Sequence, residues 1–252
     1  MYFNASGTLR SVLISCLALS ATIVTVLSAP APTDNTSPWI PRSLKALFEP
    51  RAASNQCGST GTGLYITNSG SGPQTFTVFQ GRYSINADPY KSVTVAAGKS
   101  ASVTLGVGFV GHVQRGSLLP ATWVELNMVD GAADGDVSLE IGCDGAVQVQ
   151  ASAITGGLKP PVFGFYDPTL FSKAPADAFF NPANPTHENL GGTLTKAHGV
   201  LDATGTIATG VINQATLNYE QSVLAQSAEY LWGGSGTGQA EASNNCLLIT
   251  FY

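Results

Sequence analysis

The stretch Ala121–Gln150 reads ATWVELNMVDGAADGDVSLEIGCDGAVQVQ and contains two runs in which apolar and polar residues alternate. Alternation predicts β-strands, because successive side chains of a strand point to opposite faces. On either side of the turn sequence DGAADG, one face carries Trp123, Glu125 and Asn127, then Asp136, Ser138 and Glu140. If the apolar residues between them face a core, Glu125, Asp136 and Glu140 stand together on the other side of a hairpin.

The same stretch concentrates the charge of the chain. Six carboxylates lie between Glu125 and Asp144, with no Lys or Arg among them. From Ala52 onward the chain has 7 Lys and Arg against 14 Asp and Glu, a net charge of −7. An acidic and charge-poor surface argues against nucleic acid and anionic membranes as partners.

The first 52 residues have a different composition. One basic residue, Arg10, precedes an apolar run from Val12 to Leu27 that ends in small residues, a layout typical of a secretory signal peptide over residues 1–29. A membrane anchor is the alternative, but the run is shorter than the roughly 20 residues that a span needs and carries four hydroxyl side chains. Residues 30–52 are rich in Pro, Ser and Thr and are predicted to form a linker or pro-segment, in which Asn35 is a candidate glycosylation site. We expect a secreted protein that is free of the membrane after cleavage.

Short strands separated by turn sequences follow. They are predicted at Gly63–Asn68, Gln74–Gln80, Lys91–Ala96, Ser100–Leu105, Phe109–Gln114, Thr122–Val129, Gly135–Ile141 and Gly145–Gln150. Thr, Val and aromatic residues dominate these segments, as strands favour, and Gly, Pro, Asn and Asp separate them. The spacing predicts an antiparallel sandwich or barrel over residues 53–154, completed by a closing strand at Cys246–Tyr252 within residues 240–252.

Residues 155–239 have another pattern and are predicted to form a loop-and-helix insertion. The first part is rich in proline and is predicted to be an ordered loop. Its aromatic side chains, expected to be buried beneath it, are Phe163, Phe165, Tyr166, Phe171, Phe179 and Phe180. Apolar residues then recur at helical spacing, which predicts a helix over Thr206–Trp232.

The cysteines indicate one disulfide. Cys16 is removed with the signal peptide, which leaves Cys57, Cys143 and Cys246, so one disulfide and one free thiol is the simple expectation for an oxidising compartment. Cys57 and Cys246 flank the folded region, and a bond between them would tie its ends together. No Cys/His cluster suggests zinc, and DGAADGD does not match a calcium loop, so no metal or other cofactor is expected. His112 alternates with apolar neighbours and is interpreted as a surface or rim residue.

Several segments, in order, resemble the thaumatin-like family, which includes osmotin and the class 5 pathogenesis-related proteins. They are LYITNSGSGPQTFTVFQ (64–80), VTVAAGKSASVTLGVGFVGHVQRGS (93–117), TWVELNM (122–128), GDVSLEIGCDGAV (135–147) and the C-terminal Cys with its strand. The resemblance implies a mainly β protein, a flattened antiparallel sandwich with a loop-and-helix side domain and an acidic cleft between them. In that family the cleft is associated with β-1,3-glucan binding, antifungal activity and sometimes weak glucanase activity. The scarcity of cysteines is similar to that of a divergent fungal branch.

The resemblance also implies site residues. When the motifs are aligned, Glu125 corresponds to the cleft glutamate of the family and Asp136 corresponds to its first cleft aspartate. The next cleft aspartate falls on Ile141, which is not acidic, and the cleft arginine falls on Gly116. Acidic residues lie close to Ile141, at Glu140 and Asp144, and Arg115 lies next to Gly116. The candidate binding set is therefore Glu125, Asp136, Glu140, Asp144 and Arg115.

Glu125 and Asp136 are also the candidate catalytic pair. If Asn127 opposes Asp136, the two carboxylates are diagonal and about 7–8 Å apart, which suits an inverting glycoside hydrolase better than a retaining one. A solvated acidic face that serves solubility is the alternative interpretation. The leading hypothesis is a secreted monomer that binds cell-wall β-glucan, because the missing aspartate favours binding over hydrolysis. The others are a weak endo-β-1,3-glucanase, with Glu125 as acid and Asp136 as base or stabiliser, and a secreted effector or interaction protein with a vestigial cleft.

Overall fold

The computed structural model describes residues 57, 61–81, 84–182, 199–205, 212–225, 229, 231 and 238–252. The predicted signal peptide, the pro-segment and the candidate glycosylation site at Asn35 lie outside these residues. Within the described residues, no helix has the length and apolar character that a membrane span requires.

Strands dominate the described part of the chain. Their bounds are β1 Gly63–Asn68, β2 Gln74–Gln80, β3 Asp88–Val95, β4 Lys99–Thr104, β5 Val110–Arg115, β6 Trp123–Val129, β7 Ala132–Ser138, β8 Val147–Ala151, β9 Val162–Gly164, β10 Gln239–Ala242 and β11 Cys246–Phe251. The first two strands have the predicted bounds, and the next six begin and end within three residues of the predicted positions. β9 is an addition, because it lies in the segment predicted to be a loop.

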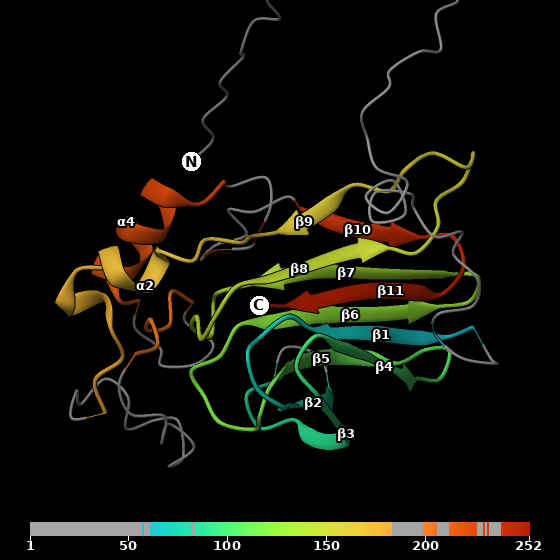
Figure 1. Ribbon diagram of the computed structural model, residues 1–252, viewed down its shortest axis with the longest axis horizontal. Helices are drawn as coiled ribbons and strands as arrows, with labels where there is room; N and C mark the ends of the chain where they lie inside the picture. The colour runs from blue at the N-terminus through green and yellow to red at the C-terminus, as the bar shows by residue number, and fades with distance from the viewer. Residues whose placement is uncertain are drawn as a thin grey trace, which may run out of the picture. The chain divides into compact units, whose positions relative to one another are not determined.

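The strands form two sheets, shown in Figure 1. A five-stranded sheet has the order β4-β1-β11-β8-β9, and a six-stranded sheet has the order β10-β7-β6-β5-β2-β3. Paired strands are antiparallel except β1 and β11, which are parallel. Apolar side chains of both sheets form one continuous core between them. The predicted mainly β sandwich is therefore confirmed.

The core follows from the alternation of the strands. Leu64 and Ile66 of β1 are fully buried, whereas Tyr65 and Thr67 are partly exposed. In β6, Val124 is fully buried and Glu125 is partly exposed. Phe76 of β2 and Phe251 of β11 join the two sheets, with stacked ring centroids 4.5 Å apart. Each such side chain contributes about 1.5–3 kcal/mol on burial, so these rows hold the sandwich together.

A disulfide joins Cys57 to Cys246, which are 189 residues apart in the sequence. Cys246 is the first residue of β11, and Cys57 lies shortly before β1, the parallel neighbour of that strand. The bond therefore ties together the two ends of the folded region. Cys143 is a free and buried thiol.

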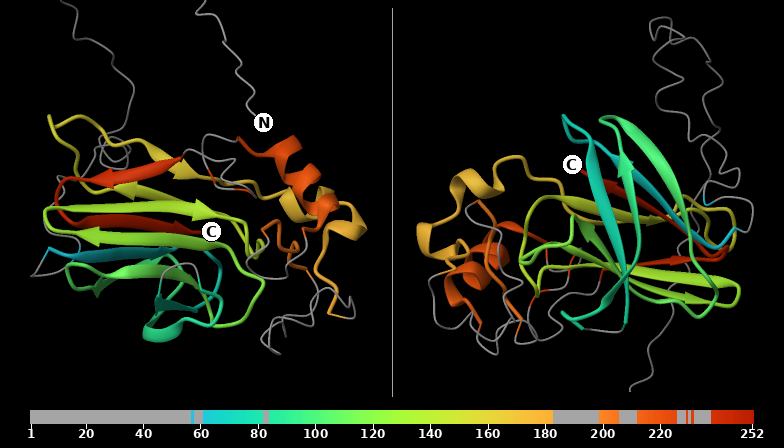
Figure 2. Two further views of the ribbon diagram at one scale, coloured as in Figure 1. Left: turned by 180° about the vertical axis from the view of Figure 1, so that it is seen from behind. Right: turned by 90° about the horizontal axis from the view of Figure 1, so that it is seen from below.

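The described helices between β9 and β10 lie at one end of the strands in each view of Figure 2. The segment between these two strands contains α2 Leu170–Lys173, the 3-10 turn η1 Ala176–Ala178 and α4 Gln214–Val223. α4 begins where the Asn213 side chain accepts hydrogen bonds from the backbone of Ala215 and Thr216, a favourable N-cap. It ends at Val223, because Leu224 is extended, so the predicted helix over residues 206–232 is too long.

Two side chains of this segment depart from expectation. Tyr166, predicted to be buried, is 58% exposed, whereas Phe165 and Phe180 are buried as predicted. Glu220 of α4 is fully buried, and neither of its carboxyl oxygens has a hydrogen-bond partner. Burial raises the pKa of Glu220 well above its ordinary value, and the nearby carboxylate of Glu229 adds to the effect. Burial therefore favours the protonated form of Glu220 in the folded protein.

Candidate functional site

One row of residues on the outer face of the six-stranded sheet defines the candidate site. The strand register places Glu125 of β6 directly opposite Asp136 of β7, with His112 of β5 on one side and Gln239 of β10 on the other. Phe79 of β2 continues the row beyond His112. Neighbouring strands are about 4.8 Å apart, so these side chains lie next to one another across five strands.

This register corrects the prediction that Asn127 opposes Asp136. The predicted turn DGAADG is wrong, because only Asp130 and Gly131 form the turn and β7 begins at Ala132. An Asp-Gly pair is sufficient for a two-residue hairpin loop, and Gly131 takes the positive φ of +79° that the turn needs. The two carboxylates are therefore directly opposed, with Cβ atoms about 4.5–5.5 Å apart, and not diagonal.

A cavity of about 360 Å³ lies over this row. Its lining consists of Val110, Gly111, His112, Trp123, Glu125, Leu126, Asn127, Asp134, Asp136, Ser138, Glu140 and Gln239. The structure thus brings together Glu125, Asp136 and Glu140, although Glu140 lies just beyond the end of β7. The described lining contains no Lys or Arg, so nothing in it neutralises the carboxyl groups.

The environment of the cavity favours protonated carboxyl groups. Burial raises the pKa of Glu125 to about 7, with a further contribution from the charge of Glu140, while a hydrogen bond from Ser138 opposes the shift. Burial raises the pKa of Asp136 to about 8, and the charges of Glu125 and Glu140 add to it. Burial also raises the pKa of Glu140. Below about pH 7 the carboxyl groups of Glu125 and Asp136 therefore both donate and accept hydrogen bonds.

An aromatic stack forms one wall of the cavity. His112 is 4% exposed, and its ring centroid lies 3.7 Å from that of Trp123 and 4.9 Å from that of Phe79, with nearly parallel planes. Burial lowers the pKa of His112 to about 3, although a hydrogen bond with Gln114 opposes this. The interpretation of His112 as a surface or rim residue is therefore wrong, since it is a buried and neutral stacking residue.

Sequence reasoning missed this stack, although a signal for it exists. Trp123 Nε1 donates to Gln114 Oε1 at 2.7 Å, which fixes the indole beside His112. Alternation along β5 puts His112 and Gln114 on one face, and alternation along β6 puts Trp123 on the face of Glu125. If β5 and β6 are taken as neighbouring strands, this alternation places the rings of His112 and Trp123 beside the carboxylate of Glu125.

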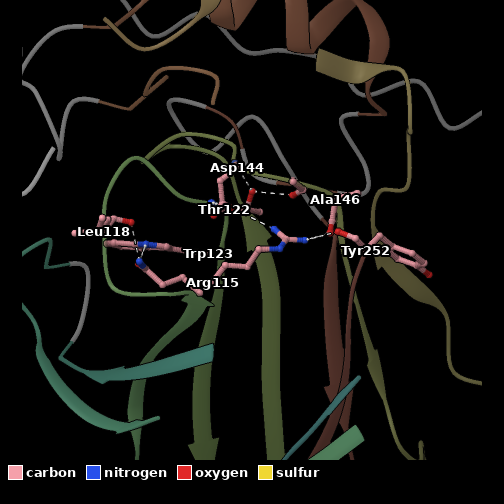
Figure 3. A network of polar contacts seen from close by, with 9 residues as sticks. Arg115, Leu118, Thr122, Trp123, Asp144, Ala146 and Tyr252 are labelled. Atoms are coloured by element: carbon pink, nitrogen blue, oxygen red, sulfur yellow. Dashed lines mark hydrogen bonds and ion pairs between the residues drawn. The ribbon is translucent and has the colours of Figure 1, made fainter. Parts of the chain in front are cut away.

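Arg115 and Asp144, the other two members of the candidate binding set, are not part of this cavity. Arg115 Nη1 donates to Asp144 Oδ1 at 3.1 Å, and Nη2 donates to the carbonyl oxygens of Ala146 and Tyr252 (Figure 3). The side chains of the ion pair are 6% and 0% exposed. Arg115 shares a strand face with buried Val113, which directs it to the interior. The pair therefore links the two sheets and does not reach a ligand in the cavity.

The described residues contain no group of three or more His, Cys, Asp and Glu side chains that could hold a metal ion. His187 and His198 lie outside these residues. The thiol of Cys143 is buried, and burial raises its pKa above the ordinary value. The lining of the cavity offers carboxyl groups, the amides of Asn127 and Gln239, the hydroxyl of Ser138 and the aromatic rings of His112 and Trp123.

Comparisons with known proteins give low similarity. No protein-family model matches the chain, and no curated protein matches it in sequence. Among solved structures, the chain is similar to the thaumatin-like xylanase inhibitor TLXI, at 13% identity and a TM-score of 0.32, over 75% of this chain and 99% of that one. It is also similar to the protein elicitor MoHrip2 from Magnaporthe oryzae, at 14% identity and a TM-score of 0.30, over 42% and 77% of the two chains. TM-scores this low carry no argument, so the sandwich rests on the strands and sheets themselves.

Proposed function

We propose that this chain is a secreted thaumatin-like protein whose acidic cavity binds a neutral cell-wall polysaccharide, with β-1,3-glucan as the first candidate. The observation that carries the proposal is the direct opposition of Glu125 and Asp136 in a cavity that also holds Glu140. The sequence segments that resemble the thaumatin-like family and the apolar N-terminal run support the assignment to that family and to secretion.

The carboxyl groups suit the hydroxyls of a neutral sugar. A protonated carboxyl group donates one hydrogen bond and accepts others, as a sugar hydroxyl does. The side chains of Asn127, Ser138 and Gln239 add further donors and acceptors to the same cavity. An acidic polymer would be repelled as soon as Glu125 or Asp136 ionises, because the described lining has no cation.

The raised pKa values make the binding depend on pH. A ligand that covers the cavity removes water from Glu125 and Asp136, which disfavours their charged forms further. The protonated protein therefore binds the glycan better. We expect affinity to be highest below about pH 7 and to fall as the pH passes through the pKa values of about 7 and 8.

Calorimetric titration with a soluble β-1,3-gluco-oligosaccharide tests the proposal. At pH 5.5, Glu125→Leu should bind about tenfold more weakly than wild type, because it loses its hydrogen bonds. Glu125→Gln should retain binding and lose part of the pH dependence. Asp88→Leu, which removes an exposed carboxyl group on β3, is the control. Equal affinity of Glu125→Leu and the control, or no binding by wild type, would overturn the proposal and leave a secreted interaction protein as the next hypothesis.

The observed register favours a second candidate function, a retaining β-1,3-glucanase. The Cβ atoms of directly opposed residues are about 5 Å apart, which allows their carboxyl groups to take the separation of about 5–5.5 Å of retaining glycoside hydrolases. One carboxyl group must be ionised while the other stays protonated, and the raised pKa values of Glu125 and Asp136 restrict this state to about pH 7–8. Release of reducing sugar in that range, lost in Asp136→Asn, would support hydrolysis, and no release between pH 5 and 9 would exclude it.

A further inference from the structure

The outer face of the five-stranded sheet lies on the side of the sandwich opposite the cavity. The strand register gives its outward residues as Ser100, Ser102, Tyr65, Thr67, Leu248, Thr250, Gln148, Gln150 and Val162. None of them is charged, and the sequences of β1, β8, β9 and β11 contain no Asp, Glu, Lys or Arg. We call this set the uncharged face.

A face of this kind is unusual for a solvated sheet. Charged residues normally cover outward positions, because they keep a protein soluble and prevent sheets from associating. Hydroxyl and amide side chains take their place here, and the acidic residues lie on the other sheet. The uncharged face spans five strands, which corresponds to about 19 Å across the strands.

Several side chains of the uncharged face are already held in place. Thr67 Oγ1 and Ser100 Oγ are 2.9 Å apart, and Gln150 Nε2 donates to the carbonyl oxygen of Pro160 at 2.7 Å. Tyr252, which follows β11, donates its hydroxyl to Gln148 Oε1 at 2.5 Å. Such side chains lose little conformational entropy when a ligand covers them.

Two exposed aromatic rings extend this face at one end. The centroids of the rings of Tyr166 and Tyr252 lie 4.4 Å apart, and these residues are 58% and 36% exposed. An aromatic ring offers an apolar face, and its hydroxyl offers a hydrogen bond. These are the two contacts that a sugar ring can use, through its C–H groups and its hydroxyls.

We propose that the uncharged face is a second polysaccharide-binding surface, which takes several neighbouring chains of a neutral, packed polysaccharide, while the cavity takes a single chain. Nucleic acid and anionic lipid need cations, and the face offers none. A stable dimer needs a more apolar interface, and Leu248 and Val162 are the only aliphatic residues among the outward positions. The two sites share no residue, so a substitution can abolish binding at one site and leave binding at the other unchanged.

Depletion of the full chain, produced by secretion, from suspensions of microcrystalline cellulose and insoluble β-1,3-glucan tests this proposal. Thr250→Glu combined with Val162→Glu puts two charges on the uncharged face, at side chains that make no hydrogen bond within the described part of the chain. Ala97→Glu combined with Val107→Glu adds the same charge at two exposed turn positions outside this set and is the matched control. A near-ultraviolet circular dichroism spectrum shows whether each variant is folded, and Tyr166→Ala is a milder second variant.

We expect the charged face variant to bind the particles about tenfold more weakly than the control, because the added charges lose water on contact with a neutral polymer. Tyr166→Ala should weaken particle binding without affecting titration with the soluble oligosaccharide. Glu125→Leu should still bind the particles, which separates this surface from the cavity. The proposal is overturned if wild type stays in solution, if the folded face variant binds like the control, or if wild type is a dimer that the face variant dissociates.

Discussion

Replacing Arg115 by Met should destabilise the protein by about 3–5 kcal/mol, the usual cost of breaking a buried ion pair on one side. The guanidinium donates to Asp144 and to the carbonyl oxygens of Ala146 and Tyr252, and it lies 4.9 Å from the ring centroid of Phe251. Met retains most of the packing volume. It leaves the carboxylate of Asp144, whose side chain is 0% exposed, without its cation, and two carbonyl oxygens lose a donor.

The structure also indicates how the damage can be repaired. Asp144 Oδ1 accepts a hydrogen bond from the backbone N–H of Thr122 at 3.1 Å, and the amide oxygen of an Asn can do the same. Adding Asp144→Asn to Arg115→Met removes the uncompensated charge and keeps this contact. The double variant should therefore be more stable than Arg115→Met alone, an interaction that a double-mutant cycle measures.

Urea denaturation and thermal melting give the result. A loss of 3–5 kcal/mol in a domain of this size corresponds to a decrease in Tm of about 6–20 °C. Lys91→Met removes one exposed positive charge from β3 and should change the stability by less than about 0.5 kcal/mol. A loss below about 1 kcal/mol for Arg115→Met, or no recovery in the double variant, would refute the view that this ion pair holds the sheets together.

Three other variants test the structure. An alanine at position 145 would place its Cβ 2.8 Å from the guanidinium of Arg115. Gly145→Ala should therefore lower the free energy of unfolding, measured by urea denaturation, by about 1–3 kcal/mol. An unchanged midpoint of urea denaturation would contradict this contact. Cys57→Ser with Cys246→Ser should cost about 2–5 kcal/mol, and adding a reductant to wild type should give the same loss. Glu220→Gln removes a buried carboxyl group of raised pKa. Because the pKa of Glu220 is raised, the stability of wild type falls as the pH rises above the ordinary range of a carboxyl pKa. The variant should therefore lose less stability than wild type between pH 5 and 8. Equal losses of stability in the two proteins would disprove the unpaired burial of Glu220.

The sequence predicts which way most side chains point, because the period of a strand is two residues. Alternation alone places Glu125 outward and Val124 inward, and it brings Glu125, Asp136 and Glu140 to one side of the sheet. Alternation does not predict the strand register, because a slip of two residues leaves every side chain on the same face. Only the turn decides it, and the Asp-Gly pair within DGAADG forms a shorter turn than the whole segment suggests.

The remaining differences between the sequence-based predictions and the structure arise from contacts between residues distant in the sequence. Arg115 is polar and lies close to the cavity in sequence, yet its carbonyl acceptors come from Ala146 and Tyr252, which no local pattern connects with it. The burial of His112 depends on rings from two other strands. Helical periodicity overestimates α4, because the extended backbone at Leu224 ends the helix where spacing alone would continue it.

The parallel pairing of β1 with β11 has a consequence for the order of folding. β11 lies between β1 and β8 in its sheet, so the strand made latest fills the middle of a sheet whose other strands are made earlier. Until β11 leaves the ribosome, β1 and β8 both present unpaired backbone groups to their surroundings. Contacts between residues so distant in sequence slow folding. Substitutions in β11 should therefore reduce the yield of folded protein more than substitutions in the edge strand β3.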